Sequence, residues 1–92
     1  MIEIFKADEL GYLSWVHNNP RGFVVNIDNP NTTPTYPMMH AASHKVISSS
    51  SRGNYTTVRY FKVCSTSLTE LESWSQENYK RHPTRCKQCS PA

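Results

Sequence analysis

The residues of this chain with the clearest chemistry are its three cysteines and two of its histidines. Near the C-terminal end, Cys86 and Cys89 are separated by two residues, a spacing at which one turn presents two thiolates to a single metal ion. Upstream, the sequence holds three further nitrogen or sulfur ligands, His40, His44 and Cys64. Zinc takes four such ligands in a tetrahedron. The sequence therefore predicts Zn²⁺ in a closed, structural site that leaves no place for a substrate.

The choice of ligands depends on how the chain runs past the histidines. On a strand, His40 and His44 would share a face but lie about 13 Å apart, too far to bind one ion together. We therefore expect one histidine, and the predicted metal ligands are His44, Cys64, Cys86 and Cys89. Cys64 should lie at a strand end just before a helix, where the helix dipole favours the thiolate. If Cys64 is instead a buried core thiol, both histidines and the two C-terminal cysteines form the set.

Closing this site sets a condition on the tail of the chain. A helix from Leu68 to Tyr79 is about 18 Å long, and the tail from Lys80 to Cys86 spans about 23 Å when extended. The tail must therefore run back along the helix in an extended, ordered form. The other use of a Cys-x-x-Cys spacing is a redox pair, which needs a thioredoxin-like βαβ context that this sequence lacks.

Hydrophobic periodicity predicts two helices. Asp8–Asn18 has apolar residues at helical spacing and two acids in its first turn. Leu68–Tyr79 begins after Ser67, which forms a capping box with Glu70: the serine accepts from a first-turn amide and the glutamate reaches back.

Three strands are expected beside the helices. Phe23–Ile27 and Tyr55–Cys64 are rich in β-branched and aromatic residues, and Met38–Ile47 should hold a strand or a strand followed by a turn. Ile2–Phe5 alternates like a short edge strand. The sequence therefore predicts one α+β domain over residues 1–92, with an antiparallel sheet of about three strands flanked by two helices.

Length and composition limit the class of protein. A chain of 92 residues with 37% hydrophobic residues has a small core, to which a zinc site would add stability. Three cysteines cannot all pair in a disulfide scaffold, and no segment approaches the roughly 20 apolar residues of a membrane span. We therefore expect a cytoplasmic protein with reduced thiols and no contact with a membrane.

The net charge of +3 is unevenly distributed along the chain. The tail after Asn78 carries four basic residues and no acid, which suits a phosphate backbone, an acidic protein face or simply a solvated surface. The candidate binding residues are mostly basic: His40, Arg52, Arg59, Lys62, Arg81, Arg85 and Lys87.

Several stretches form a familiar set: Tyr12–Val16, Asn19–Asn26, His40–His44, Lys62–Ser65, Leu71–Trp74 and the closing Cys-x-x-Cys. Together they resemble a small bacterial or phage domain with the pattern YLxWxxxNPxGYVxN, HxAx then Cys or His, KxC, LxxW and CxxC. That domain occurs alone or attached to restriction-type and other defence proteins. In its pattern the place of His44 is commonly Cys and Cys64 is part of the motif, so the resemblance implies His44, Cys64, Cys86 and Cys89 as ligands. The chain departs from the pattern at Ala41, where the usual residue is Arg.

This ligand set leaves His40 as a motif histidine outside the metal site. It could hydrogen-bond a metal ligand, line a binding pocket or fill a core position.

These observations predict a zinc-stabilised binding module for nucleic acid, with modified DNA among its targets. The alternative is a small protein-interaction or inhibitory protein of phage or mobile-element origin that acts on host defence machinery. A nuclease of the His-Asn-His type is not expected, because His17, Asn19 and His40 have no acidic partner nearby and sulfur ligands suit a closed site. We expect no enzymatic activity and no small-molecule substrate.

Overall fold

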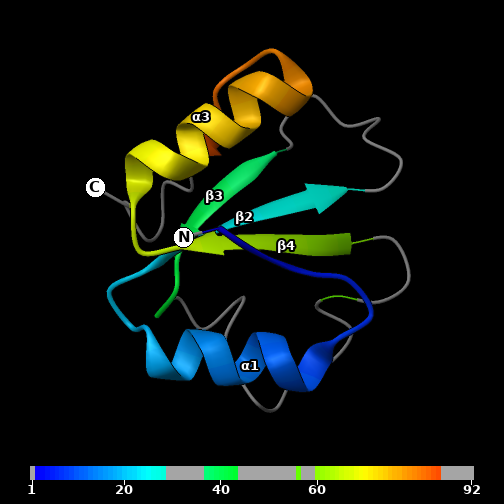
Figure 1. The fold of residues 1–92 in the computed structure, drawn as a ribbon, viewed down its shortest axis with the longest axis vertical. Coiled ribbons are helices and arrows are strands. Elements are labelled where there is room, and N and C mark those ends of the chain that lie inside the picture. The colour runs from blue at the N-terminus through cyan, green and yellow to red at the C-terminus, as the bar shows by residue number, and fades with distance from the viewer. Residues whose placement is uncertain (1, 29–36, 44–55, 57–59, 86–92) are drawn as a thin grey trace.

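Two helices cover opposite faces of a five-stranded mixed sheet in the computed structural model (Figure 1). The structure describes residues 2–28, 37–43, 56 and 60–85. The helices are α1 (Glu9–Asn18) and α3 (Leu68–Tyr79). The strands, in chain order, are β1 (Glu3–Phe5), β2 (Phe23–Asp28), β3 (Met38–Ala41), β4 (Tyr60–Ser65) and β5 (Thr84–Arg85).

The strands lie in the order β1-β4-β2-β3-β5. Neighbouring strands are antiparallel except for β3 and β5, which are parallel. In the centre of the sheet, Val24 of β2 is opposite both Cys64 of β4 and His40 of β3. Residues directly opposite one another point to the same face of a sheet. The register therefore places His40, Val24 and Cys64 in one row on one face.

The α+β class and the two helices are confirmed, but the predicted sheet was too small. The described residues form five strands where about three were expected, and the sheet is mixed where it was expected to be antiparallel. The added strands are edges: β1, which the sequence indicated as an edge strand, and β5, which has two residues. Two residues cannot show an alternating pattern, so β5 has no local signal in the sequence.

Both helix starts follow from local sequence. The Asp8 side chain accepts a hydrogen bond from the Gly11 amide at 2.9 Å. A Cβ on Gly11 would lie 2.3 Å from the Asp8 carboxylate, so glycine allows this cap to form. Ser67 caps α3 by accepting from the Glu70 amide at 3.2 Å. The Glu70 carboxylate accepts a hydrogen bond from the Ser65 hydroxyl, which itself accepts one from the Ser67 amide. Glu70 is therefore linked to the Ser67 amide through Ser65 and not directly, as in a standard capping box.

The core has one part on each face of the sheet. On the α3 face, Leu71 packs against inward residues of the central strands: Val25, Ile27, Met39 and Val63. On the α1 face, Tyr12 and Val16 of the helix pack with residues of the sheet and the turn after β3: Val24, Ala42 and Cys64. The α1 face also carries the polar residues Asn26, His40 and Lys62, by the register of β2, β3 and β4.

Neither helix in the described part of the chain is both long and apolar enough to cross a lipid bilayer.

Candidate functional site on the α1 face of the sheet

The α1 face brings together polar and titratable side chains that lie far apart in the sequence. His40 is 5% exposed, Lys62 is 2% exposed and Cys64 is fully buried. Buried polar groups cost free energy unless they are hydrogen-bonded or paired with an opposite charge. This face is therefore where the chain departs most clearly from a purely apolar core.

The buried Lys62 side chain contacts Asn26 and the ring of Tyr12. Its Nζ donates a hydrogen bond to Asn26 Oδ1 at 2.8 Å and lies 5.7 Å from the centre of the Tyr12 ring. Burial lowers the pKa of Lys62 from 10.5 to about 8, and the interaction with Glu9 partly opposes that shift. The sequence predicted a phosphate contact for Lys62. That contact would require its ammonium to leave this enclosed position.

Glu9 joins the same cluster from the first turn of α1. Its Oε1 accepts hydrogen bonds from the backbone amide and the hydroxyl of Thr56. Its Oε2 is buried and has no hydrogen-bond partner among the residues that the structure describes. Thr56 is 3% exposed. A carboxylate and a lysine are thus placed together beneath the start of α1, which is positioned by the Asp8 cap.

Sequence reasoning missed Glu9, Asn26 and Thr56 as members of this cluster. A signal existed for Asn26, since it interrupts the apolar run of β2 at an inward position. Lys62 likewise stands between Phe61 and Val63 in β4. A polar residue in an otherwise apolar strand indicates either an outward position or a buried partner. For Thr56 there was no local signal, because its partners lie 47 and 48 residues away.

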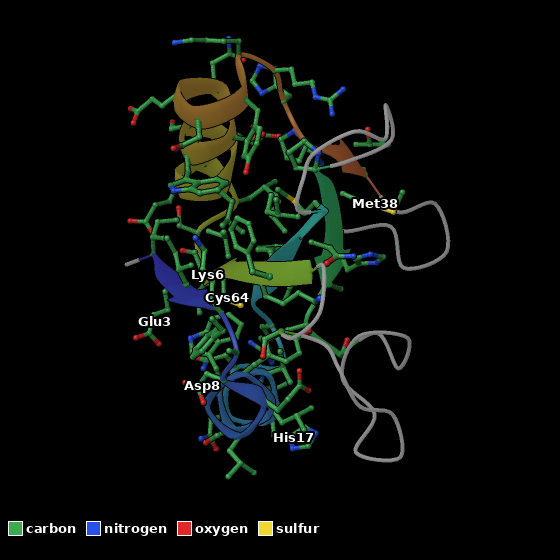
Figure 2. The ribbon with its side chains drawn as sticks, turned by 90° about the vertical axis from the view of Figure 1, so that its right-hand side faces the viewer. Glu3, Lys6, Asp8, His17, Met38 and Cys64 are labelled. Carbon is green, nitrogen blue, oxygen red and sulfur yellow. The ribbon has the colours of Figure 1, made fainter. Side chains whose placement is uncertain are left out.

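Cys64 has the surroundings of a core thiol. Its side chain points from β4 toward α1 (Figure 2), where Tyr12, Val16 and Val24 surround it. Burial raises the pKa of the Cys64 thiol well above its usual range, and the nearby Lys62 charge only partly offsets this. A thiol enclosed by apolar side chains in this way is typical of a core residue.

The tail runs back along α3, as expected, as far as Arg85. The Ser75 hydroxyl donates to the Arg81 carbonyl at 2.7 Å, and Arg85 forms an ion pair with Glu72. The Thr84 amide donates to the Pro37 carbonyl at 2.8 Å, which starts the pairing with β3. The tail thus arrives at β3. Three strand spacings, about 14 Å, separate β5 from β4, the strand of Cys64.

The predicted metal site falls mostly outside the described residues. His44, Cys86 and Cys89 lie there, as do the binding candidates Arg52, Arg59 and Lys87. Within residues 2–28, 37–43, 56 and 60–85, no three His, Cys, Asp or Glu side chains are grouped to hold a metal ion.

His40 is close to the end of its strand. β3 ends at Ala41, and the chain turns at Ala42 and Ser43. The separation of about 13 Å expected between the two histidines assumed one continuous strand. That assumption does not hold, and the objection to both histidines binding one ion falls with it.

No family model matches this chain, and neither a curated protein nor a solved structure shows significant similarity to it.

Proposed function

We propose that this chain is a zinc-stabilised nucleic-acid-binding module. In this proposal the sheet and helices are a scaffold, and phosphate contacts come from cations outside it. The partition of charge along the sequence carries the proposal. Residues 29–69 and 78–92 contain no acidic residue and hold eight of the ten basic ones. Four of these eight are the proposed phosphate contacts: Lys45, Arg52, Arg59 and Lys87.

This partition suits phosphate binding because cations without acidic neighbours in sequence keep their charge available to a polyanion. The cations of the scaffold are used differently. Lys62 is buried, and Arg85 is paired with Glu72. The net charge of +3 thus understates the basic character of residues 29–69 and 78–92.

The zinc ligands that these observations favour are both histidines and the C-terminal pair: His40, His44, Cys86 and Cys89. Cys64 is set aside because it is a core thiol packed against α1 and lies two strands away from β3. Cys86 follows Arg85 directly in the chain, and Arg85 is paired with Met39, the neighbour of His40. When bound, zinc would cross-link β3 to the tail, and its binding free energy would add to folding. We assign no catalytic step, since four protein ligands leave no place for a substrate.

The experiment compares two triple variants for binding to a short DNA duplex at low salt. The first replaces Arg52, Arg59 and Lys87 with Gln. The matched control removes the same charge from exposed scaffold positions, with Lys6, Arg21 and Lys80 replaced by Gln. We expect the first variant to lose at least about tenfold in affinity and the control to stay within about threefold. Equal losses in the two variants would contradict the proposal.

A protein-binding role is the second candidate, and exposed apolar residues favour it. Leu10 on α1 is 84% exposed and Ile4 on β1 is 49% exposed. In that case the chain would act as a small inhibitory protein of phage or mobile-element origin on a protein of the host defence machinery. Leu10→Ser would then weaken capture of that protein, while DNA binding would be absent in the wild type.

A further inference from the structure

The residues from the end of the β1–α1 turn to the start of α1 form hydrogen bonds with the amide, the carbonyl and the hydroxyl of Thr56. The Thr56 carbonyl accepts from the Ala7 amide at 2.6 Å, and its hydroxyl accepts from the Asp8 amide at 2.8 Å. Its own amide and hydroxyl both donate to Glu9 Oε1, the hydroxyl at 3.1 Å. Three consecutive residues thus make four hydrogen bonds to one distant threonine, which is 3% exposed.

The backbone of this turn includes one residue in an unfavourable conformation. Ala7 has a φ of 51°, in the left-handed region that alanine rarely adopts. In a strand, successive amides point to opposite sides, so the amides of Ala7 and Asp8 could not meet one residue. A left-handed residue turns successive amides toward a common point. The unfavourable φ therefore coincides with the convergence of both amides on Thr56.

Glu9 Oε1 accepts both hydrogen bonds from Thr56, and Lys62 is the basic group that interacts with the same side chain. Within the described part of the chain, Glu9 Oε2 is buried without a hydrogen-bond partner, which is costly for a carboxylate that lacks a nearby cation. Lys62 interacts electrostatically with Glu9, and Asn26 fixes the position of its ammonium. The contacts run from β2 through β4 and α1 to Thr56.

We propose that Glu9 is a positioning residue that anchors Thr56 and thereby fixes where the segment between β3 and β4 joins the scaffold. Arg52 lies four positions before Thr56 and Arg59 three positions after it. The consequence for binding rests on the proposed nucleic-acid function, in which these two cations, close to Thr56 in the sequence, contact phosphate. The anchor itself rests only on the contacts of Thr56.

The test uses Glu9→Gln, with Glu77→Gln on the exposed side of α3 as the matched control. Both variants remove one negative charge, which by itself should leave DNA affinity unchanged or slightly increased. The anchor predicts the opposite sign for Glu9→Gln alone: a loss of about tenfold, as expected when hydrogen bonds to a charged group are weakened. Glu9→Gln binding as tightly as Glu77→Gln would overturn the positioning role.

A second pair of variants, at Thr56, tests the same positioning role independently of Glu9→Gln. Thr56→Ser keeps the amide and the hydroxyl and should bind DNA within about twofold of wild type. Thr56→Val keeps the shape and loses both hydroxyl bonds, so a loss of about tenfold is expected. DNA affinity is compared at a temperature where circular dichroism shows every variant to be folded. Under this condition a loss of stability alone would not change the affinity. Equal affinities for the serine and valine variants would contradict the proposal.

Hydrogen exchange at the Thr56 amide separates failure of the anchor from failure of the proposed function. We expect exchange at this amide to be at least about tenfold faster in Glu9→Gln than in wild type or Glu77→Gln, with or without DNA. If wild type does not bind DNA but this difference is found, the anchor stands and the proposed function fails. If the Thr56 amide exchanges equally in all three proteins, the anchor is wrong whatever the DNA result.

Discussion

The two faces of the sheet bury side chains of different kinds. On the α3 face, Leu71 packs against apolar residues of the three central strands. On the α1 face, Lys62, Asn26 and His40 share the interior with Tyr12 and Cys64. A buried lysine and a buried carboxylate oxygen stabilise a fold less than well-packed hydrophobic residues of the same volume. The α3 face therefore contributes most to the stability of the fold. The α1 face buries polar groups that lower this stability, as is typical of residues retained for function.

The largest effect is expected on the α3 face. Leu71 is fully buried, and Leu71→Ala removes its side chain from the centre of that core. We expect the free energy of unfolding to fall by about 3 kcal/mol, within the usual range for buried leucine. Urea denaturation measures this. A loss below about 1 kcal/mol would mean that the α3 face is not the main source of stability.

On the α1 face, removing the charge of Lys62 alone should destabilise the fold more than removing the charges of Lys62 and Glu9 together. Lys62→Met leaves Glu9 without its cation and should cost about 2 kcal/mol. Adding Glu9→Gln should recover at least about 1 kcal/mol of that loss, because the buried charge is then gone. The double-mutant cycle is measured by denaturation of all four proteins. Additive losses would show that the two side chains are independent.

Cys64 distinguishes a core thiol from a metal ligand. Cys64→Ala should cost about 1 kcal/mol and leave zinc content unchanged, since only a small buried group is lost. Cys86→Ser should lower zinc content and destabilise the fold strongly, because metal binding free energy is folding free energy. Elemental analysis and melting of both variants give the answer. Loss of zinc in Cys64→Ala would restore His44, Cys64, Cys86 and Cys89 as the ligand set.

The lowered pKa of Lys62 predicts how stability depends on pH. Between about 8 and 10.5 the unfolded chain holds a proton that folded Lys62 has lost, so the free energy of unfolding rises with pH from about 8. Cys64 acts in the opposite direction above its ordinary value of 9.0, because burial keeps its thiol protonated in the folded state. We expect a rise of about 1 kcal/mol between pH 8 and 9, absent in Lys62→Met.

Urea denaturation at these two pH values tests this dependence. A flat profile in wild type would show that the Lys62 amine titrates like an exposed lysine.

Local patterns in the sequence were enough for the helices and the central strands. The caps at Asp8 and Ser67 mark both helix starts, and the apolar run Phe23–Ile27 marks β2. The edge strand β5 was not predictable, because its two residues are in a strand only through pairing with Met38 and Met39. Such pairings depend on the tertiary fold, which spacing along the chain does not encode.

The candidate site was predictable only in part. His40 and Lys62 were selected for their chemistry, and the structure buries both. Lys62 was expected to contact phosphate, whereas a core position was one of three roles left open for His40. Glu9 and Thr56 meet across 47 residues, so no motif joins them. Cys64 was placed correctly at the end of a strand before a helix, yet its burial follows from how α1 packs on the sheet.

The salt dependence of DNA affinity in the wild-type protein tests the central claim most directly. The proposed phosphate contacts are Lys45, Arg52, Arg59 and Lys87, and each contact adds about 0.9 to the magnitude of the slope of log affinity against log salt. We predict binding at low salt that weakens with a slope of about −3, as three or more contacts require. No binding at low salt, or an affinity that does not change with salt, would contradict nucleic-acid binding and favour a protein partner.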